Sequence, residues 1–313
     1  MADDKRPLMW AYLIHLSYNM WGDRNVPGLQ YPYWERKPYL RCDRATWDDL
    51  VARMADAGVT HVVIDVGDGV RFESRPEIGV EGAWTPDELT EALDRIRSLG
   101  MAPVPKLNFS ACHDAWMGDY ARMLSTPAYY AVCRDLIAET ARIFGNPAYF
   151  HLGMDEEDLA NQRHFRFVTI RQYDLWWNDL RFLVNEAEER GARAWVWSDF
   201  AWSHPEEFAA QMPRTVLQSN WYYNDDFAPN DPAVQAYAQL DAAGFDQAPA
   251  GSVWASPTNF VRTVEHCRRV IAPERLVGFL QTVWKPTLPE TLAIHAEAIR
   301  QVAAGRQAWA SCR

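Results

Sequence analysis

Short apolar runs alternate with longer amphipathic segments along almost the entire chain. This alternation is typical of repeated βα units that build a parallel sheet. The apolar runs predict eight strands, over residues 8–16, 61–66, 101–107, 149–152, 194–197, 215–218, 252–255 and 276–280. Eight strands in 313 residues fit an α/β fold of the (β/α)8 (TIM) barrel type, which needs roughly 250 residues. Because no linker or change in composition divides the chain, residues 1–313 are expected to form a single domain.

The amphipathic segments predict helices over residues 46–57, 85–99, 127–144, 173–190 and 290–303. Thr46 and Thr85 are the predicted N-caps of the first two helices, because a threonine hydroxyl accepts from an unsatisfied backbone N–H. Glu88 lies three residues after Thr85, which is the spacing of a capping box. The polar segment 224–232 is expected to be a loop on the active side of the barrel.

Composition and charge argue against several classes of partner. The net charge of −11 argues against nucleic acid, because phosphate backbones require clustered Lys and Arg. No apolar stretch approaches the roughly 18 residues of a spanning helix, so no membrane partner is expected. The first residues lack an apolar leader, which favours a cytoplasmic location. The five cysteines form no C-x-x-C pair, which is typical of free thiols. The sequence leaves a homo-oligomer open.

In a (β/α)8 barrel the active site lies at the carboxyl ends of the strands, so the residues after each apolar run are the candidates. Polar and aromatic side chains gather at these positions. The fifteen tryptophans fit either the core or a sugar site, because the apolar face of a sugar packs on an aromatic ring. The candidates for substrate binding are His15, Asp65, Asn108, His113, Asp114, His151, Trp197, Asp199, Trp221, Tyr222, Tyr223, Trp254 and Trp284.

Asp155 and Glu156 are the most specific feature, since two adjacent carboxylates directly follow the fourth predicted strand. Like charges this close raise one pKa, so one carboxyl group can stay protonated as an acid while its neighbour remains ionised. Successive residues point in different directions, which lets the two address different atoms of one substrate. The alternative is a solvated acidic loop that caps the next helix.

Three other positions carry alternatives. Asp65 is either a sugar ligand or the partner of Lys106. His113, with the adjacent Asp114, either binds substrate hydroxyls, tunes Glu156, or stabilises a long loop. His151 is expected to support the turn after the fourth strand.

The motif His151-x-Gly153-x-Asp155-Glu156 resembles the H-x-G-x-D-E signature of the family 20 glycoside hydrolases, the β-N-acetylhexosaminidases. Weaker likenesses follow in order along the barrel: Phe144-Gly145 before the fourth strand, Trp197-Ser198-Asp199, Trp221, and the spacing from Gly278 to Trp284. Only the first motif is specific. The resemblance implies a (β/α)8 barrel that hydrolyses β-linked N-acetylhexosamine.

The resemblance also implies roles for individual residues. Glu156 is expected to be the general acid/base that protonates the leaving oxygen. Asp155 is expected to orient the substrate's acetamido group, whose oxygen acts as the nucleophile, so that the anomeric configuration is retained. Tyr222 or Tyr223 is expected to help hold that group, with Trp197, Trp221, Trp254 and Trp284 as walls of the sugar subsite. No metal ion and no organic cofactor is implied, and the partner is a small oligosaccharide or glycoconjugate.

Two positions depart from the family pattern. The family has an arginine at the end of the first strand, whereas this segment reads Leu13-Ile14-His15-Leu16-Ser17-Tyr18. The family has a glutamate after the tryptophan of the eighth strand, whereas Lys285 follows Trp284 here. We therefore expect a retained catalytic centre with altered contacts to the outer sugar hydroxyls, and a changed preference such as N-acetylgalactosamine.

Two other functions remain open. A metal-dependent barrel enzyme, such as an isomerase or amidohydrolase, has enough candidate ligands in His15, His113, His151, Asp155, Glu156 and Asp199. Against it, no His-x-His pair lies on the first strand. A non-catalytic carbohydrate-binding barrel is the second alternative, because fold does not guarantee function.

Overall fold

The computed structural model describes residues 7–25, 27 and 31–311, and within these residues eight parallel strands form one sheet. The strands are β1 Met9–His15, β2 His61–Asp65, β3 Ala102–Lys106, β4 Tyr149–His151, β5 Arg193–Trp197, β6 Leu217–Ser219, β7 Ala250–Ser252 and β8 Gly278–Thr282. Their spatial order is β6-β5-β4-β3-β2-β1-β8-β7. Hydrogen bonds from Ala248 N to Gln218 O and from Ala250 N to Asn220 O, both 2.8 Å long, join β6 to the β7 segment and close the barrel. The predicted (β/α)8 fold is therefore confirmed.

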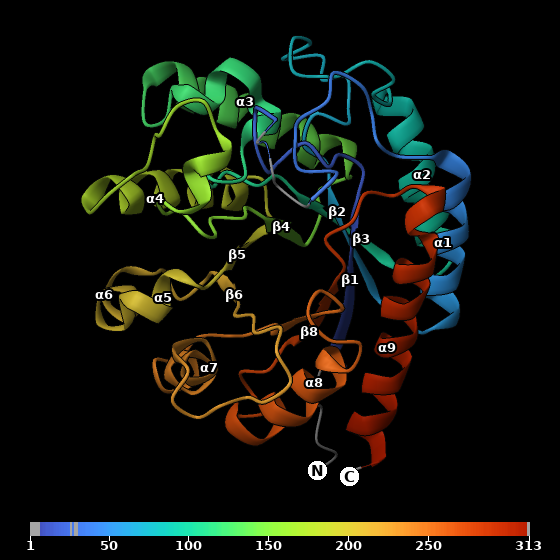
Figure 1. The fold of residues 1–313 in the computed structure, drawn as a ribbon, viewed down its shortest axis with the longest axis vertical. Helices are drawn as coiled ribbons and strands as arrows, with labels where there is room; N and C mark the ends of the chain where they lie inside the picture. Colours follow the sequence, from blue (N-terminus) through green and yellow to red (C-terminus); the bar gives the residue numbers. More distant parts are fainter. Residues whose placement is uncertain (1–6, 26, 28–30, 312–313) are drawn as a thin grey trace.

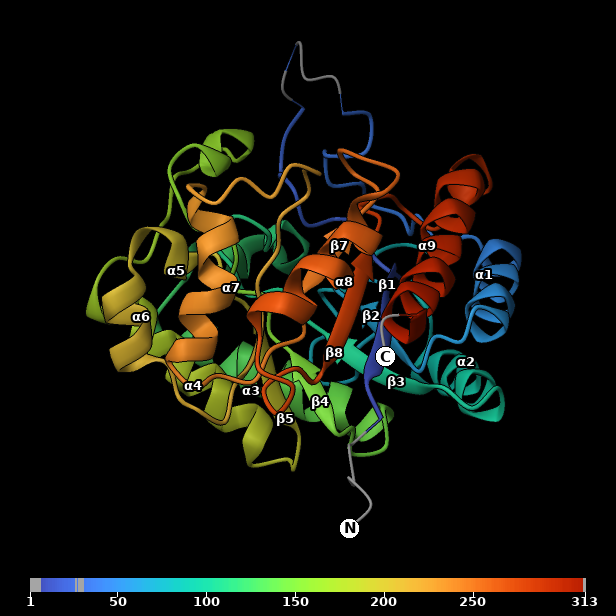
Figure 2. The same ribbon diagram turned by 90° about the horizontal axis from the view of Figure 1, so that it is seen from below.

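Helices surround this barrel on the outside (Figures 1 and 2). They are α1 Arg44–Asp56, α2 Pro86–Ser98, α3 Pro127–Ile143, α4 Asp174–Glu188, α5 Phe200–Ser203, α6 Pro205–Gln211, α7 Pro232–Ala242, α8 Asn259–Val270 and α9 Leu292–Ser311. Three short 3-10 helices lie in the loops, η1 Ala115–Arg122, η2 Asn161–His164 and η3 Pro289–Thr291. The last helix, α9, packs against α1 and α8 and so links the two ends of the barrel sequence. None of the helices described here combines the length and the hydrophobicity that crossing a membrane requires.

Local capping signals predicted the start of α2 correctly but not that of α1. Thr85 caps α2 and forms the predicted capping box with Glu88. The predicted cap at Thr46 is wrong: Asp43 caps α1, and its Oδ1 accepts from the backbone N–H of Thr46 at 2.8 Å. An aspartate one turn earlier is the better cap because its carboxylate also suits the positive end of the helix dipole. Helices α5 to α8 were not located from the sequence.

Two strands lie about two residues from their predicted positions. β6 covers Leu217–Ser219 where residues 215–218 were expected, and β7 covers Ala250–Ser252 where 252–255 were expected. Both strands are short, so apolar periodicity alone cannot set their ends. Their register comes instead from pairing with neighbours, such as Trp195 opposite Leu217 and Ala250 opposite Leu280.

The register also places polar residues in one layer inside the barrel. His15 pairs with Asp65, Asp65 with Lys106, and Lys106 with His151, at the last positions of β1 to β4. All four side chains are buried. The residues that follow this layer therefore line the space at the carboxyl end of the barrel.

Candidate active site

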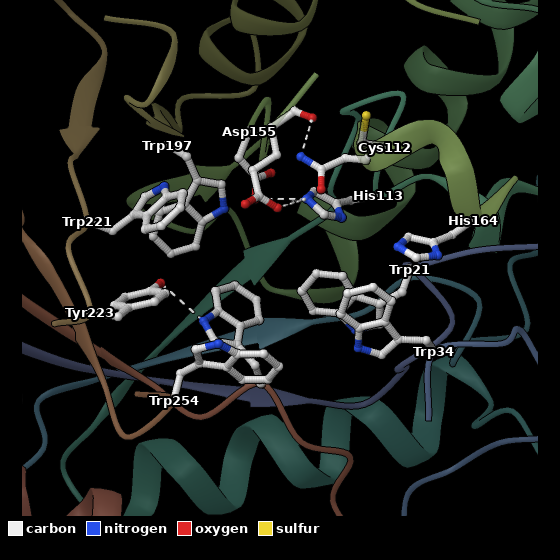
Figure 3. A pocket seen from close by; sticks show the side chains of 13 residues that line it. Trp21, Trp34, Cys112, His113, Asp155, His164, Trp197, Trp221, Tyr223 and Trp254 are labelled. Atoms are coloured by element: carbon white, nitrogen blue, oxygen red, sulfur yellow. Dashed lines mark hydrogen bonds and ion pairs between the residues drawn. The ribbon is translucent and has the colours of Figure 1, made fainter. Parts of the chain in front are cut away.

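A cavity of about 740 Å³, its open mouth included, lies at the carboxyl ends of the strands (Figure 3). Its walls are mostly aromatic, and its charged groups come from the segments after β3 and β4. The lining residues are Trp21, Trp34, Cys112, His113, Asp155, Glu156, Asn161, His164, Trp197, Trp221, Tyr223, Trp254 and Trp284. A pocket with flat apolar walls and a few convergent polar groups suits a small organic ligand such as a sugar.

The cavity brings together eight of the residues predicted from the sequence. These are His113, Asp155, Glu156, Trp197, Trp221, Tyr223, Trp254 and Trp284. The other predicted residues lie elsewhere: below the cavity, behind its wall or outside it. These are His15, Asp65, Asn108, Asp114, His151, Asp199 and Tyr222.

The turn after β4 presents the two carboxylates in an unusual backbone conformation. Gly153, Met154 and Glu156 have positive φ angles of 76°, 72° and 52°. A Cβ atom on Gly153 would lie 1.9 Å from Oδ1 of Asn108, so both the dihedral angle and the space require glycine there. His151 supports the turn as predicted, because its Nδ1 accepts the N–H of Gly153 at 3.1 Å.

Asp155 is the buried member of the carboxylate pair. Its Oδ1 accepts from the side-chain amide of Asn108 at 2.8 Å, and its Oδ2 lies 3.4 Å from Nε2 of His113. Burial raises the pKa of Asp155, and the negative charge of Glu156 raises it further, whereas His113 opposes the rise. Asn108 therefore acts behind the cavity wall, as a hydrogen-bond donor to Asp155.

Glu156 is the more accessible member, with 31% of its side chain exposed against 10% for Asp155. Its Oε2 lies 3.1 Å from Nε2 of His113, which thus contacts both carboxylates. Burial alone lowers the pKa of His113, but Asp155 and Glu156 outweigh it and raise that pKa. The two adjacent carboxylates therefore have unlike surroundings, and of the alternatives for His113 the structure favours the contact with Glu156.

The layer below the cavity holds the predicted residues His15, Asp65 and His151. The ammonium group of Lys106 contacts Oδ2 of Asp65, and Nδ1 of His15 lies 3.6 Å from the same oxygen. Burial by itself raises the pKa of Asp65, but Lys106 and His15 together outweigh it and the pKa is lowered. Asp65 is therefore the partner of Lys106 rather than a lining residue of the cavity.

The two tyrosines after β6 have different positions. Tyr223 lines the cavity, and its hydroxyl accepts from Nε1 of Trp284 at 3.1 Å. Tyr222 instead donates to Asp226 outside the cavity. Of the two candidates, only Tyr223 is placed to contact a ligand.

Asp114 is fully buried beside this site. Neither of its oxygens has a hydrogen-bond partner within the described chain, and burial raises its pKa well above the usual range. Asp114 does not line the cavity, so it is not placed as a sugar ligand.

The acidic segment 155–158 is only partly solvated, because Asp158 is exposed whereas the side chain of Glu157 is 2% exposed. Glu157 pairs with Arg171 at 2.5 Å, and Arg171 also contacts Asp179 of α4 at 3.2 Å. This network ties the loop between β4 and α4 to the body of the barrel. Breaking the buried ion pair between Glu157 and Arg171 would leave an unpaired charge inside the protein and so cost free energy of folding. The pair therefore favours a fixed turn around Asp155 and Glu156.

Five lining residues were not among the sequence candidates. They are Trp21, Trp34, Cys112, Asn161 and His164. All five lie in loops, and the long loop after β1 folds back so that Trp21 and Trp34 stack with ring centres 5.3 Å apart. Trp21 and Cys112 stand near motifs visible in the sequence, but Trp34 and His164 carry no local signal of their positions.

His113, Asp155 and Glu156 could also hold a metal ion. One ligand atom from each residue lies within 4.8 Å of the others. One imidazole and two carboxylates form a donor set that Zn²⁺ accepts, with a water completing the coordination. Of the six ligand candidates from the sequence, the structure gathers these three in one cluster, whereas His15 and His151 lie in the layer below.

Comparison with known proteins gives structural matches alone. No family model matches the sequence, and no curated protein matches it. A family 20 exo-β-N-acetylglucosaminidase from Vibrio harveyi, solved with N-acetylglucosamine, is similar with a TM-score of 0.64 at 13% identity, over 95% of this chain and 54% of that protein. This chain therefore spans about half the length of the Vibrio protein.

Two further structures are similar in the same way. An N-acetyl-β-hexosaminidase from Streptomyces plicatus has a TM-score of 0.64 at 12% identity, over 95% of this chain and 64% of the other. A β-N-acetylhexosaminidase from Bacteroides fragilis has a TM-score of 0.61 at 12% identity, over 93% of this chain and 65% of the other. At such identities a structural likeness establishes the fold alone. This chain thus shares its barrel fold with the matched part of these proteins.

Proposed function

We propose that this protein is a glycoside hydrolase that removes β-linked N-acetylhexosamine with retention of configuration. The observation that carries the proposal is the pair Asp155 and Glu156, adjacent in sequence and unlike in environment, at one wall of an aromatic cavity. One buried and one accessible carboxyl group can divide the roles of charge stabiliser and acid. The resemblance of the motif to the family 20 signature and the shared fold support the same function.

In this mechanism Glu156 protonates the leaving oxygen and later accepts the proton of the attacking water. Asp155, held by Asn108, orients the acetamido group and stabilises the positive charge that develops on it. The acetamido oxygen attacks the anomeric carbon and displaces the leaving group, which forms a five-membered oxazolinium ring. Water then attacks the anomeric carbon and opens this ring. Tyr223 is the candidate hydrogen-bond donor to the acetamido group, and the tryptophan walls pack on the sugar face.

The neighbours suggest the sugar class. The Vibrio enzyme was solved with N-acetylglucosamine, and a Streptomyces variant with the same sugar as product. For this chain we propose an N-acetylhexosamine at the end of a small oligosaccharide or glycoconjugate. This sequence lacks the arginine after the first strand and the glutamate after the eighth strand that are typical of family 20. Their absence favours a sugar preference other than N-acetylglucosamine, with N-acetylgalactosamine as the first candidate.

The test is hydrolysis of 4-nitrophenyl and 4-methylphenyl β-glycosides of N-acetylglucosamine and N-acetylgalactosamine. Wild type is compared with Glu156→Gln, Asp155→Asn and the control Asp226→Asn, which alters an exposed carboxylate outside the cavity. Loss of Glu156 is expected to lower kcat about 10²- to 10⁴-fold on the methylphenyl substrate, whose departure needs protonation. The loss is expected to be smaller for nitrophenyl, a better leaving group. Asp155→Asn is expected to lower kcat on both.

Each contrary result has its own meaning. A wild type that binds these sugars without turnover supports the non-catalytic barrel. Equal losses on both leaving groups for Glu156→Gln contradict its role as acid. Release of the α-anomer as first product, observed by NMR, contradicts retention.

A metal-dependent enzyme is the second candidate, because His113, Asp155 and Glu156 lie close enough to share an ion. Dialysis against a chelator, followed by zinc, manganese or magnesium addition, separates the two functions. Activity that falls with the chelator and returns with one metal favours the metal enzyme, whereas unchanged activity favours substrate-assisted hydrolysis.

A further inference from the structure

The backbone of Glu156 needs support from outside its own turn. Its φ of 52° lies in the left-handed region, and Met154 two residues earlier has a φ of 72°. Non-glycine residues rarely adopt this region and keep it only where the surrounding structure holds them. The orientation of the Glu156 side chain depends on that support, because a relaxed backbone would aim the carboxyl group elsewhere.

Asp199, directly after β5, supplies this support. Its Oδ2 accepts the backbone N–H of Glu156 at 2.8 Å. At the other end of the same turn, the N–H of Trp197 donates to the carbonyl oxygen of Gly153 at 3.0 Å. The end of β5 therefore forms a hydrogen bond with each end of the turn. One bond comes from the backbone of Trp197, and the other is accepted by the carboxyl group of Asp199.

The second oxygen of Asp199 faces a wall of the cavity. Nε1 of Trp221 lies 3.4 Å from Oδ1 of Asp199, and Trp221 lines the cavity (Figure 3). Asp199 itself does not line it. One carboxyl group thus connects the proposed acid with an aromatic wall, and both its oxygens have partners. This position differs from the substrate-binding role that the sequence favours.

We propose that Asp199 is a positioning residue, which fixes the backbone of Glu156 and the ring of Trp221 in one arrangement without touching the sugar. The inference rests on the proposed function, in which Glu156 is the acid. The proposal adds the carboxyl group of Asp199 to the site and explains how the backbone that carries Glu156 is held in place.

The groups around Asp199 decide how it responds to pH. Asp155 and Glu156 of the β4 loop act on it, and His113 of the β3 loop contacts those two carboxylates. The neighbour from β6 is the uncharged indole of Trp221. Burial, followed by the charge of Asp155, raises the pKa of Asp199 to about 8. The backbone N–H of Glu156, which donates to Asp199, opposes this rise.

Two variants test the hydrogen bond to the turn. Asp199→Asn keeps one acceptor oxygen for the Glu156 N–H, although its amide nitrogen cannot accept from Nε1 of Trp221, whereas Asp199→Ala removes the acceptor for both donors. We expect Asp199→Asn to retain kcat within about threefold. Asp199→Ala is expected to lower kcat at least about tenfold, with a smaller change in KM. Asp226→Asn is the control and should leave kcat unchanged.

Three results would overturn the proposal. An Asp199→Ala enzyme with unchanged kcat removes the positioning role. A rise in KM without a fall in kcat identifies Asp199 as a sugar ligand. An Asp199→Asn enzyme as impaired as Asp199→Ala means that the negative charge is needed. Near-ultraviolet circular dichroism of the tryptophans verifies that each variant is folded.

A readout without turnover keeps this proposal distinct from the hydrolase function. In protein labelled with nitrogen-15 on glutamate, the amide signal of Glu156, assigned with Glu156→Gln, is compared between wild type and the two Asp199 variants. Because Asp199 accepts this N–H, the signal is expected to move in Asp199→Ala far more than in Asp199→Asn. This difference in a protein that cleaves no glycoside sustains the positioning contact and rejects the hydrolase. An active enzyme whose Glu156 amide signal is the same in wild type and in Asp199→Ala rejects the contact alone.

Discussion

Nε2 of His113 lies 3.1 Å from Oε2 of Glu156, although the two residues are 43 positions apart in the sequence. The same nitrogen lies 3.4 Å from Asp155. Because the carboxylates raise the pKa of His113 against the effect of burial, the imidazole is favoured in its charged form, with its positive charge between two negative ones. In return, that charge opposes the rise in the pKa of Asp155.

Replacing His113 by Gln should therefore move the acidic limb of the kcat profile. Without the imidazolium the pKa of Asp155 rises, so the ionised form needed in the proposed mechanism is reached only at higher pH. We expect the acidic limb to shift to higher pH, because Asp155 loses the neighbouring positive charge that opposes the rise in its pKa. His204→Gln, at an exposed histidine, is the control. A profile that keeps its acidic limb in His113→Gln contradicts this role.

Replacing Gly153 by Ala should abolish activity and destabilise the protein. The new Cβ atom meets Asn108, which also holds Asp155. Gly191→Ala is a matched control, because Gly191 has a similar φ of 79° and no atom within 4 Å of a Cβ there. The control should lose about 1 kcal/mol from backbone strain alone, and Gly153→Ala distinctly more. Urea unfolding measures both, and equal losses would show that the close approach of Asn108 is harmless.

Replacing Lys106 by Met should destabilise the barrel by about 3–5 kcal/mol, because it leaves Asp65 buried without its cation. The double variant Asp65→Asn with Lys106→Met removes both charges and should recover part of the loss. Unfolding free energies of the two single variants and the double variant give the coupling between the residues. Additive losses would mean that the ion pair contributes nothing beyond packing.

Replacing Asp199 by Asn should change how stability depends on pH. The pKa of Asp199 is raised to about 8 in the folded protein, so the folded state retains a proton that the unfolded state releases near pH 4. Stability therefore falls as pH rises between these values, by at most about 1.4 kcal/mol per pH unit from this group. Asp199→Asn removes this loss. Its stability relative to wild type should be greater at pH 8 than at pH 5, and an equal difference at both would contradict the raised pKa.

The residues after β4 show how much of the site was encoded locally. The glycine, the two carboxylates and the preceding histidine stand within six positions, so a short motif was enough to predict the turn and its place after a strand. Trp197, Trp221 and Trp284 also line the cavity, because a barrel brings the carboxyl ends of all its strands to one face; their contact with a sugar stays a prediction.

The sequence alone therefore determined the strand rhythm, the barrel and the identity of the carboxylate pair, because these depend on hydrophobic spacing and on contiguous residues. Only the tertiary structure decided which polar residue at a strand end faces the cavity. Asp65 and His151 end their strands and point into the barrel layer, whereas Asp199 turns toward the backbone of Glu156. Trp34 and His164 reach the cavity through loops that fold back over it. Register and loop packing are set by contacts between distant segments, and no local pattern in the sequence records them.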